Sequence, residues 1–91
     1  MNTFLISFET YPPSLPVQRG IIENKIRSFG AWARPTSFVW LIKTPFQREI
    51  VMNVLRTALG PNDKLLVMKV DNEWIAFHLS KDVVNWMQQL L

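Results

Sequence analysis

The stretch AWARPTSFVWLIKT, residues 31–44, decides the fold that this sequence predicts. Because Pro35 has no backbone N–H to donate, it cannot lie in the middle of a central strand. We therefore expect a short strand over residues 31–34, a corner, and a longer strand over residues 37–43. Apolar side chains alternate on both faces of the longer strand, with Phe38, Trp40 and Ile42 on one face and Val39 and Leu41 on the other. A strand with two apolar faces has to be covered on both sides.

A helix is predicted on each side of this pair of strands. Upstream, residues 17–29 repeat apolar side chains at i, i+4 and i+7, and Gly30 follows where a helix-ending glycine belongs. Downstream, Thr44 is expected to cap a second helix, with Pro45 at its first position and Gln47 completing a capping box. A Gly-Pro pair ends that helix.

The remaining elements complete a ferredoxin-like plan. Residues 4–9 and residues 64–70 have strand composition and strand length, so the order is β-α-β-β-α-β. A brief extra strand over residues 73–77 and a last helix capped by Ser80 should follow. The predicted fold is α+β: one domain, residues 1–91, whose four-stranded antiparallel sheet carries two helices on one face.

The face of the sheet away from the two helices is expected to be apolar. The side chains predicted for it are Val39, Leu41, Leu65 and Val67. Together they would expose several hundred Å², more than soluble monomers usually show. Either the terminal helix folds over this face or a second copy of the chain does. Small size favours the second copy, so we predict a homodimer.

Composition excludes several kinds of chemistry. The chain has no cysteine and a single histidine, His78, which excludes disulfides, thiolate nucleophiles and histidine metal clusters. A metal would have to be a hard cation such as Mg²⁺ or Mn²⁺, held by carboxylates. No apolar run approaches the roughly 18 residues that span a bilayer, and the first residues lack the basic start of a secretory signal. We expect a cytoplasmic protein that does not contact membranes.

Charge permits a polyanionic partner. The chain carries ten Lys and Arg against seven Asp and Glu, a net charge of +3, and its cations are scattered. An ordinary solvated surface is one interpretation of this pattern, and contact with the phosphates of DNA or RNA is the other. The candidates for phosphate contacts are Arg19, Arg27, Arg34, Lys43, Arg48 and Arg56.

The first strand delivers one carboxylate, Glu9, to the point where the chain becomes a loop. A single carboxylate gives Mg²⁺ too few protein ligands, although this ion readily keeps several waters. Two copies of Glu9 across a dimer axis would supply two carboxylates and hold a shared cation. Glu9 is therefore a candidate metal ligand and catalytic residue only if it is paired across a dimer. The other interpretation is a solvated or ion-paired residue at a strand end.

Four segments resemble a known family: FLISFET, GAWARPTSFVWLIKT, NDKLLVMKV and LSKDVVNWMQQLL. They are similar to small bacterial proteins labelled SinR-family, which in turn look like CRISPR-associated protein two and virulence-associated protein D. The resemblance implies a ferredoxin-like homodimer. In CRISPR-associated protein two the first strand ends in a Tyr-Asp pair implicated in divalent-metal nuclease activity. The matching residues are Phe8 and Glu9, so the carboxylate is kept with one more methylene.

Three functions follow from these patterns. The first is a homodimeric nucleic-acid-binding or scaffolding protein resembling CRISPR-associated protein two. The second is a divalent-metal-dependent nuclease that uses paired Glu9 carboxylates. The third is a protein-interaction module of a toxin–antitoxin or defence system, with a protein partner and no nucleic acid.

Overall fold

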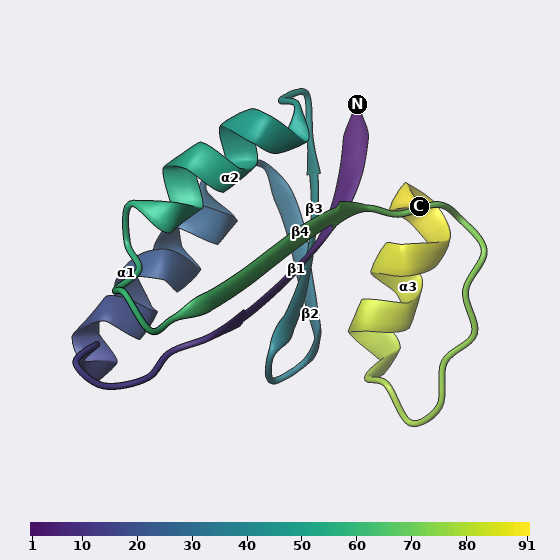
Figure 1. Cartoon of the computed structure of the whole chain (residues 1–91). Coiled ribbons are helices and arrows are strands. Elements are labelled where there is room, and N and C mark those ends of the chain that lie inside the picture. The colour runs from purple at the N-terminus through teal and green to yellow at the C-terminus, as the bar shows by residue number, and fades with distance from the viewer.

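The computed structural model describes residues 1–91 and has the predicted ferredoxin-like α+β fold (Figure 1). Its elements are β1 (Asn2–Glu9), α1 (Pro16–Arg27), β2 (Ala31–Thr36), β3 (Val39–Thr44), α2 (Arg48–Arg56), β4 (Lys64–Lys69) and α3 (Lys81–Leu90). The strands pair antiparallel in the order β2-β3-β1-β4. Helices α1 and α2 lie on one face of the sheet and α3 lies on the other (Figure 1).

The core lies between the sheet and the first two helices. In β1, Phe4, Ile6 and Phe8 are all buried on this face, as their period-two spacing predicts. Trp40 lies opposite Ile6 in the next strand. The remaining buried members of this core are Ile22, Ile26 and Phe29 from α1 and its end, Ile42 from β3, and Val51 and Leu55 from α2. Burial of this apolar surface is the main force that holds the layers together.

The register of β4 corrects one prediction. Val67 lies opposite Ile6 and Leu65 lies opposite Phe8, so Leu65 and Val67 face α1 and α2 and not the back of the sheet. The side chains that β4 presents on the back face are Leu66 and Met68. Both sets are apolar, and a shift of one residue would exchange them, so only the pairing with β1 decides which set is buried.

Helix α3 covers half of the back face. It begins after Ser80, whose Oγ accepts a hydrogen bond from the Val83 backbone N–H (3.3 Å) as predicted, and it packs against β2. The Lys43 Nζ donates to the Leu90 carbonyl oxygen (2.8 Å), which holds the end of α3 to β3. On β4, Leu66 and Met68 stay 52% and 47% exposed. We call this uncovered β1–β4 half of the back face, with Leu66 and Met68 at its centre, the open half.

Three local predictions were wrong at element ends. Strand β2 runs through Pro35, because the residue lies at a register shift in an edge strand, where a missing N–H costs no ladder bond. Thr44 does not cap α2: it still pairs with Asn2 in the sheet, and Gln47 takes the capping position. Residues 73–77 form no strand, because the chain leaves the sheet after β4 and crosses toward α3, where no strand edge is beside it (Figure 1).

Gly30 joins α1 to β2 in a conformation that favours glycine, with φ +141°. A Cβ at this position would lie 2.6 Å from the Lys43 carbonyl oxygen, so Gly30→Ala is expected to destabilise the fold by about 1–3 kcal/mol. Gly20 is the matched control, because a Cβ there meets nothing within 4 Å of this helical position. Gly20→Ala should stabilise by about 0.5–1 kcal/mol in the same urea titration. Equal effects of the two changes on stability would contradict the conclusion that the fold requires glycine at position 30 and not at position 20.

Candidate nucleic-acid interface

Three of the six predicted cations gather beside the β2 edge of the sheet. Arg19 and Arg27 lie on one side of α1, eight residues apart, and Arg34 projects from β2 toward the same helix. The Arg34 Nη2 lies 3.3 Å from Glu23 Oε2, a charge–charge contact without hydrogen-bond geometry. Since Glu23 is the acidic residue between the two helix arginines, this local group keeps an excess of positive charge.

Aromatic rings hold these guanidinium groups in place. The Arg27 Cζ lies 5.3 Å from the centre of the Trp32 ring and 5.0 Å from that of Trp40, and the Arg34 Cζ lies 4.9 Å from the Trp40 ring. The Arg19 Cζ lies 5.5 Å from the centre of the ring of Phe38, a residue of the β2–β3 turn. Cation–π contact itself uses no N–H donor, but Arg27 Nη1 also donates to Asn24 Oδ1 (3.1 Å), and Arg34 donates from Nε (3.2 Å) and Nη2 (2.7 Å) to the Ser37 carbonyl oxygen. We call these residues the arginine–aromatic face: Arg19, Arg27, Arg34, Trp32, Phe38 and Trp40.

Two rings of this face are also open to solvent. Trp32 is 41% exposed and Phe38 is 56% exposed, whereas Trp40 is fully buried beneath the arginines. Trp32 and Trp40 are in contact, with ring centres 5.4 Å apart. Arginines beside exposed aromatic rings are the combination that binds phosphates and stacks bases.

The other three candidate cations lie elsewhere. Lys43 is on the opposite face of the sheet and is bound to the Leu90 carbonyl oxygen. Arg48 begins α2 and pairs with Glu49 (3.0 Å), and Arg56 ends the same helix. The structure therefore groups half of the predicted cations and separates the rest.

Comparisons of the chain with protein-family models, with curated proteins and with solved structures find no match. No helix of this structure combines the length and the apolar composition needed to cross a membrane.

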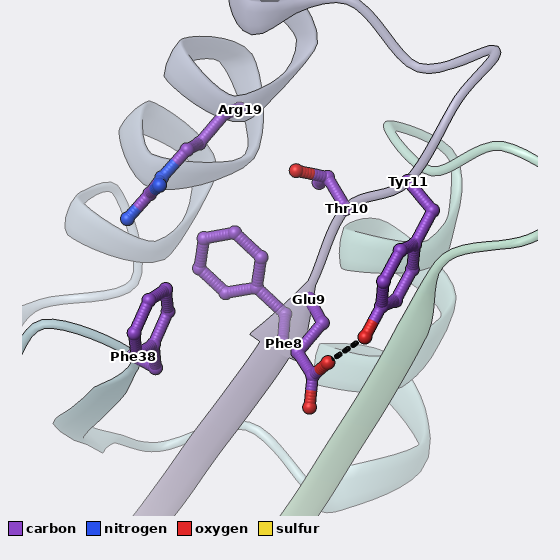
Figure 2. Close-up of a pocket in the computed structure, with 6 residues that line it drawn as sticks. All are labelled: Phe8, Glu9, Thr10, Tyr11, Arg19 and Phe38. Atoms are coloured by element: carbon purple, nitrogen blue, oxygen red, sulfur yellow. Dashed lines mark hydrogen bonds between the residues drawn. The ribbon is translucent and has the colours of Figure 1, made fainter.

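A small pocket of about 140 Å³ connects this face to the end of β1 (Figure 2). Its lining residues are Phe8, Glu9, Thr10, Tyr11, Arg19 and Phe38. Glu9 is exposed, and its Oε2 accepts a hydrogen bond from the Tyr11 hydroxyl, drawn as a dashed line in Figure 2. This bond, with burial and the charge of Glu9 adding to it, raises the pKa of Tyr11 above its ordinary value of 10.0.

Glu9 in one chain does not form a metal site. No group of three or more His, Cys, Asp or Glu side chains is arranged to hold a metal ion. Across the ladder, Glu9 faces Lys64, whose Nζ lies 5.8 Å from the centre of the Tyr11 ring. The residues of a single chain therefore do not fit Mg²⁺ or Mn²⁺, which need more carboxylate ligands than Glu9 supplies.

Asp63 holds the β1–α1 loop to the turn before β4. Its carboxylate accepts hydrogen bonds from the Tyr11 backbone N–H (2.7 Å), the Gly60 backbone N–H (2.7 Å) and the Ser14 hydroxyl. Tyr11, the partner of Glu9, is thus positioned by a residue 52 places along the chain. The sequence alone does not indicate this connection, because neither loop carries a pattern that identifies its partner.

Acid is expected to release this connection. The hydrogen bonds from Ser14, then Gly60, then Tyr11 lower the pKa of Asp63 below its ordinary value of 3.8. A carboxyl whose pKa falls on folding stabilises the protein above its unfolded pKa, and that stability is lost as pH falls through the folded pKa. Thermal unfolding from pH 7 to below about pH 4 should therefore show an acid-dependent loss that Asp63→Asn removes while lowering stability at pH 7. Asp71→Asn is the control, since Asp71 bonds only to the neighbouring Asn72 backbone; an equal effect of both changes would be inconsistent with the role of Asp63.

Proposed function

We propose that this chain is a homodimeric nucleic-acid-binding protein of the kind implied by the resemblance to CRISPR-associated protein two. The observation that carries the proposal is the convergence of Arg19, Arg27 and Arg34 on one face, with their guanidinium groups fixed by aromatic rings. Fixed guanidinium groups bind phosphate oxygens with little further loss of side-chain freedom. We place this activity in the cytoplasm, as the sequence predicts.

The spacing of the arginines suits a phosphate backbone. Eight residues of helix separate Arg19 from Arg27, a rise of about 12 Å. Along one strand of a duplex the phosphates repeat about every 3.4 Å of axis, so the row has the length of about three to four phosphates. Contacts of this kind bind without reading sequence.

The open half of the back face supports the homodimer. Leu66 and Met68 are apolar and half exposed, and Ser7 and Glu9 lie on the same side of β1. A second copy placed on this half would bury the apolar side chains and bring two Glu9 carboxylates toward one another. A dimer formed through β4 would therefore place Glu9, the residue that the resemblance implicates in metal-dependent activity, close to its interface.

Binding is tested by titrating labelled duplex and single-stranded DNA and RNA at low salt, followed by a salt series. Phosphate-driven binding should show log K falling by about 0.9 for each phosphate contact on duplex DNA per unit of log salt. Three arginines per chain predict a slope of about −2.7 for each chain that contacts the nucleic acid. Absence of any mobility shift at low salt would refute the proposal.

A charge on the open half should separate the dimer. The double change Leu66→Lys and Met68→Lys places two ammonium groups in the proposed interface, where burial of an unpaired charge is strongly unfavourable. Sedimentation should then change from twice 10.6 kDa to 10.6 kDa, and each chain should stay folded because both side chains face solvent in the single chain. Ile50→Lys, at a 46% exposed apolar side chain of α2 outside the open half, is a control that should keep the dimer. A wild-type protein that sediments at 10.6 kDa would contradict the homodimer.

The nuclease function depends on the same dimer. One specific observation favours it as a second candidate: Glu9 lies on the open half, where a symmetric partner would bring its own copy. Cleavage that needs Mg²⁺ or Mn²⁺ and is lost in Glu9→Gln, while the dimer persists, would establish it. A protein partner bound in fixed stoichiometry, without nucleic-acid binding, would instead support the interaction-module function.

A further inference from the structure

An apolar cavity of about 340 Å³ lies on the back of the sheet, on the opposite side from the arginine–aromatic face. The sheet contributes Leu5, Pro35, Val39 and Leu41, and the C-terminal segment contributes Val70, Trp74, Met87 and Leu91. Figure 1 shows that α3 lies over this face of the sheet, and both contribute residues to the lining. Protein interiors rarely leave voids much larger than a water molecule, whereas small-molecule sites of about 300–1,000 Å³ are typical.

Two carboxylates complete the lining of this cavity. Asp71 and Glu73 lie on either side of Asn72, in the connection that follows β4. Neither forms an ion pair; Asp71 Oδ1 accepts a hydrogen bond from the Asn72 backbone N–H (2.6 Å). On the same face of the sheet, the Lys43 Nζ is bound to the Leu90 carbonyl oxygen and does not line the cavity. The charged side chains of the lining are therefore both negative.

We propose that this cavity binds a small aromatic amine. The aromatic body would occupy the apolar space between the sheet and α3, in contact with Trp74. The ammonium group would lie toward Asp71 and Glu73, where a cation gains attraction and an anion is repelled. A cavity of this volume admits a ring system of one or two rings and excludes a folded partner. The site does not depend on nucleic-acid binding, because it uses none of the residues of the arginine–aromatic face.

Three indole compounds separate the contributions of shape and charge. Tryptamine carries an ammonium group, 3-methylindole is neutral, and indole-3-acetate is an anion. Calorimetry should give 1:1 binding of tryptamine with a dissociation constant below about 1 mM, weaker binding of 3-methylindole, and no binding of indole-3-acetate. In ¹⁵N spectra the indole N–H signal of Trp74, assigned with Trp74→Phe, should shift saturably with tryptamine.

Variants test the position of the ligand. Asp71→Asn with Glu73→Gln should lower tryptamine affinity by about two- to fivefold per carboxylate and leave 3-methylindole affinity unchanged. Val39→Phe places a ring inside the cavity and should abolish binding of both compounds. Ile75→Phe is the control: Ile75 is 98% exposed and does not line the cavity, so the added ring should keep binding.

Several outcomes would overturn the proposal. They are the absence of saturable tryptamine binding, equal affinity for indole-3-acetate, and tryptamine affinity that Val39→Phe leaves intact. Backbone ¹⁵N spectra establish whether Val39→Phe is folded. If it is not, the exposed pair Asp71→Asn and Glu73→Gln gives the deciding comparison, and unchanged tryptamine affinity in that variant would refute the site.

Discussion

Replacing Arg19 and Arg27 together by glutamine is expected to lower nucleic-acid affinity by about a hundredfold at low salt. Each guanidinium–phosphate contact contributes about 1.5 kcal/mol or more, which is roughly tenfold in affinity. Removing two contacts per chain should also reduce the salt slope by about 2 for each chain bound. Fluorescence anisotropy with a labelled duplex, measured from 20 to 200 mM salt, determines both quantities.

A matched control separates these positions from net charge. Arg48→Gln with Arg56→Gln also removes two positive charges, but from α2, away from the arginine–aromatic face. This control should lose well under tenfold in affinity, because charges outside the contact act only through a screened field. Equal losses in the two double variants would mean that binding follows total charge, and the assignment of the face would be wrong.

Trp40→Ala is expected to cause the largest loss of stability, about 3–5 kcal/mol in urea-induced unfolding. The indole is fully buried between α1 and the sheet, and both Arg27 and Arg34 lie against its ring. A domain of this size has a total stability of about 5–15 kcal/mol, so this one truncation would remove a large part of it. Binding should weaken as well, because two guanidinium groups lose the ring that positions them.

Trp40→Phe provides the informative comparison. The Trp40 Nε1 is buried and has no hydrogen-bond partner, so the native indole already bears the cost of an unsatisfied N–H. Phenylalanine removes that donor and keeps a ring for the arginines, so its loss of stability should be much smaller than that of alanine. Trp32→Ala, at the half-exposed ring that contacts Trp40, should also cost less. If Trp40→Phe were as unstable as Trp40→Ala, the shape of the indole, and not burial of an aromatic ring, would be what stabilises the packing of α1 on the sheet.

Element order and the buried face of β1 could be predicted because local patterns determine them. Phe4, Ile6 and Phe8 alternate with a set that includes Ser7 and Glu9, so the first set predicts the more deeply buried face of β1. In β4 the alternating sets are equally apolar, and their orientation depends on pairing with a strand more than 50 residues away. Residues 73–77 have strand composition, but a strand needs a neighbour, and that is a property of the whole fold.

The candidate site could be predicted only in part, for the same reason. Helical spacing places Arg19 and Arg27 on one side of α1 without knowledge of the fold. The addition of Arg34 requires the path of β2 past Pro35, which the sequence pattern predicted as a corner. The connection from Asp63 to Tyr11 links two loops that are distant in sequence, and no local pattern indicates such a contact.

The unequal anchoring of the layers has a consequence for motion. Helix α3 buries only Met87, whereas the strands and the first two helices share a continuous core. Local opening begins where the fewest apolar contacts must be broken. The C-terminal segment can therefore separate from the sheet by local opening while the four strands stay paired. Its amide hydrogens should exchange with solvent long before those of β1.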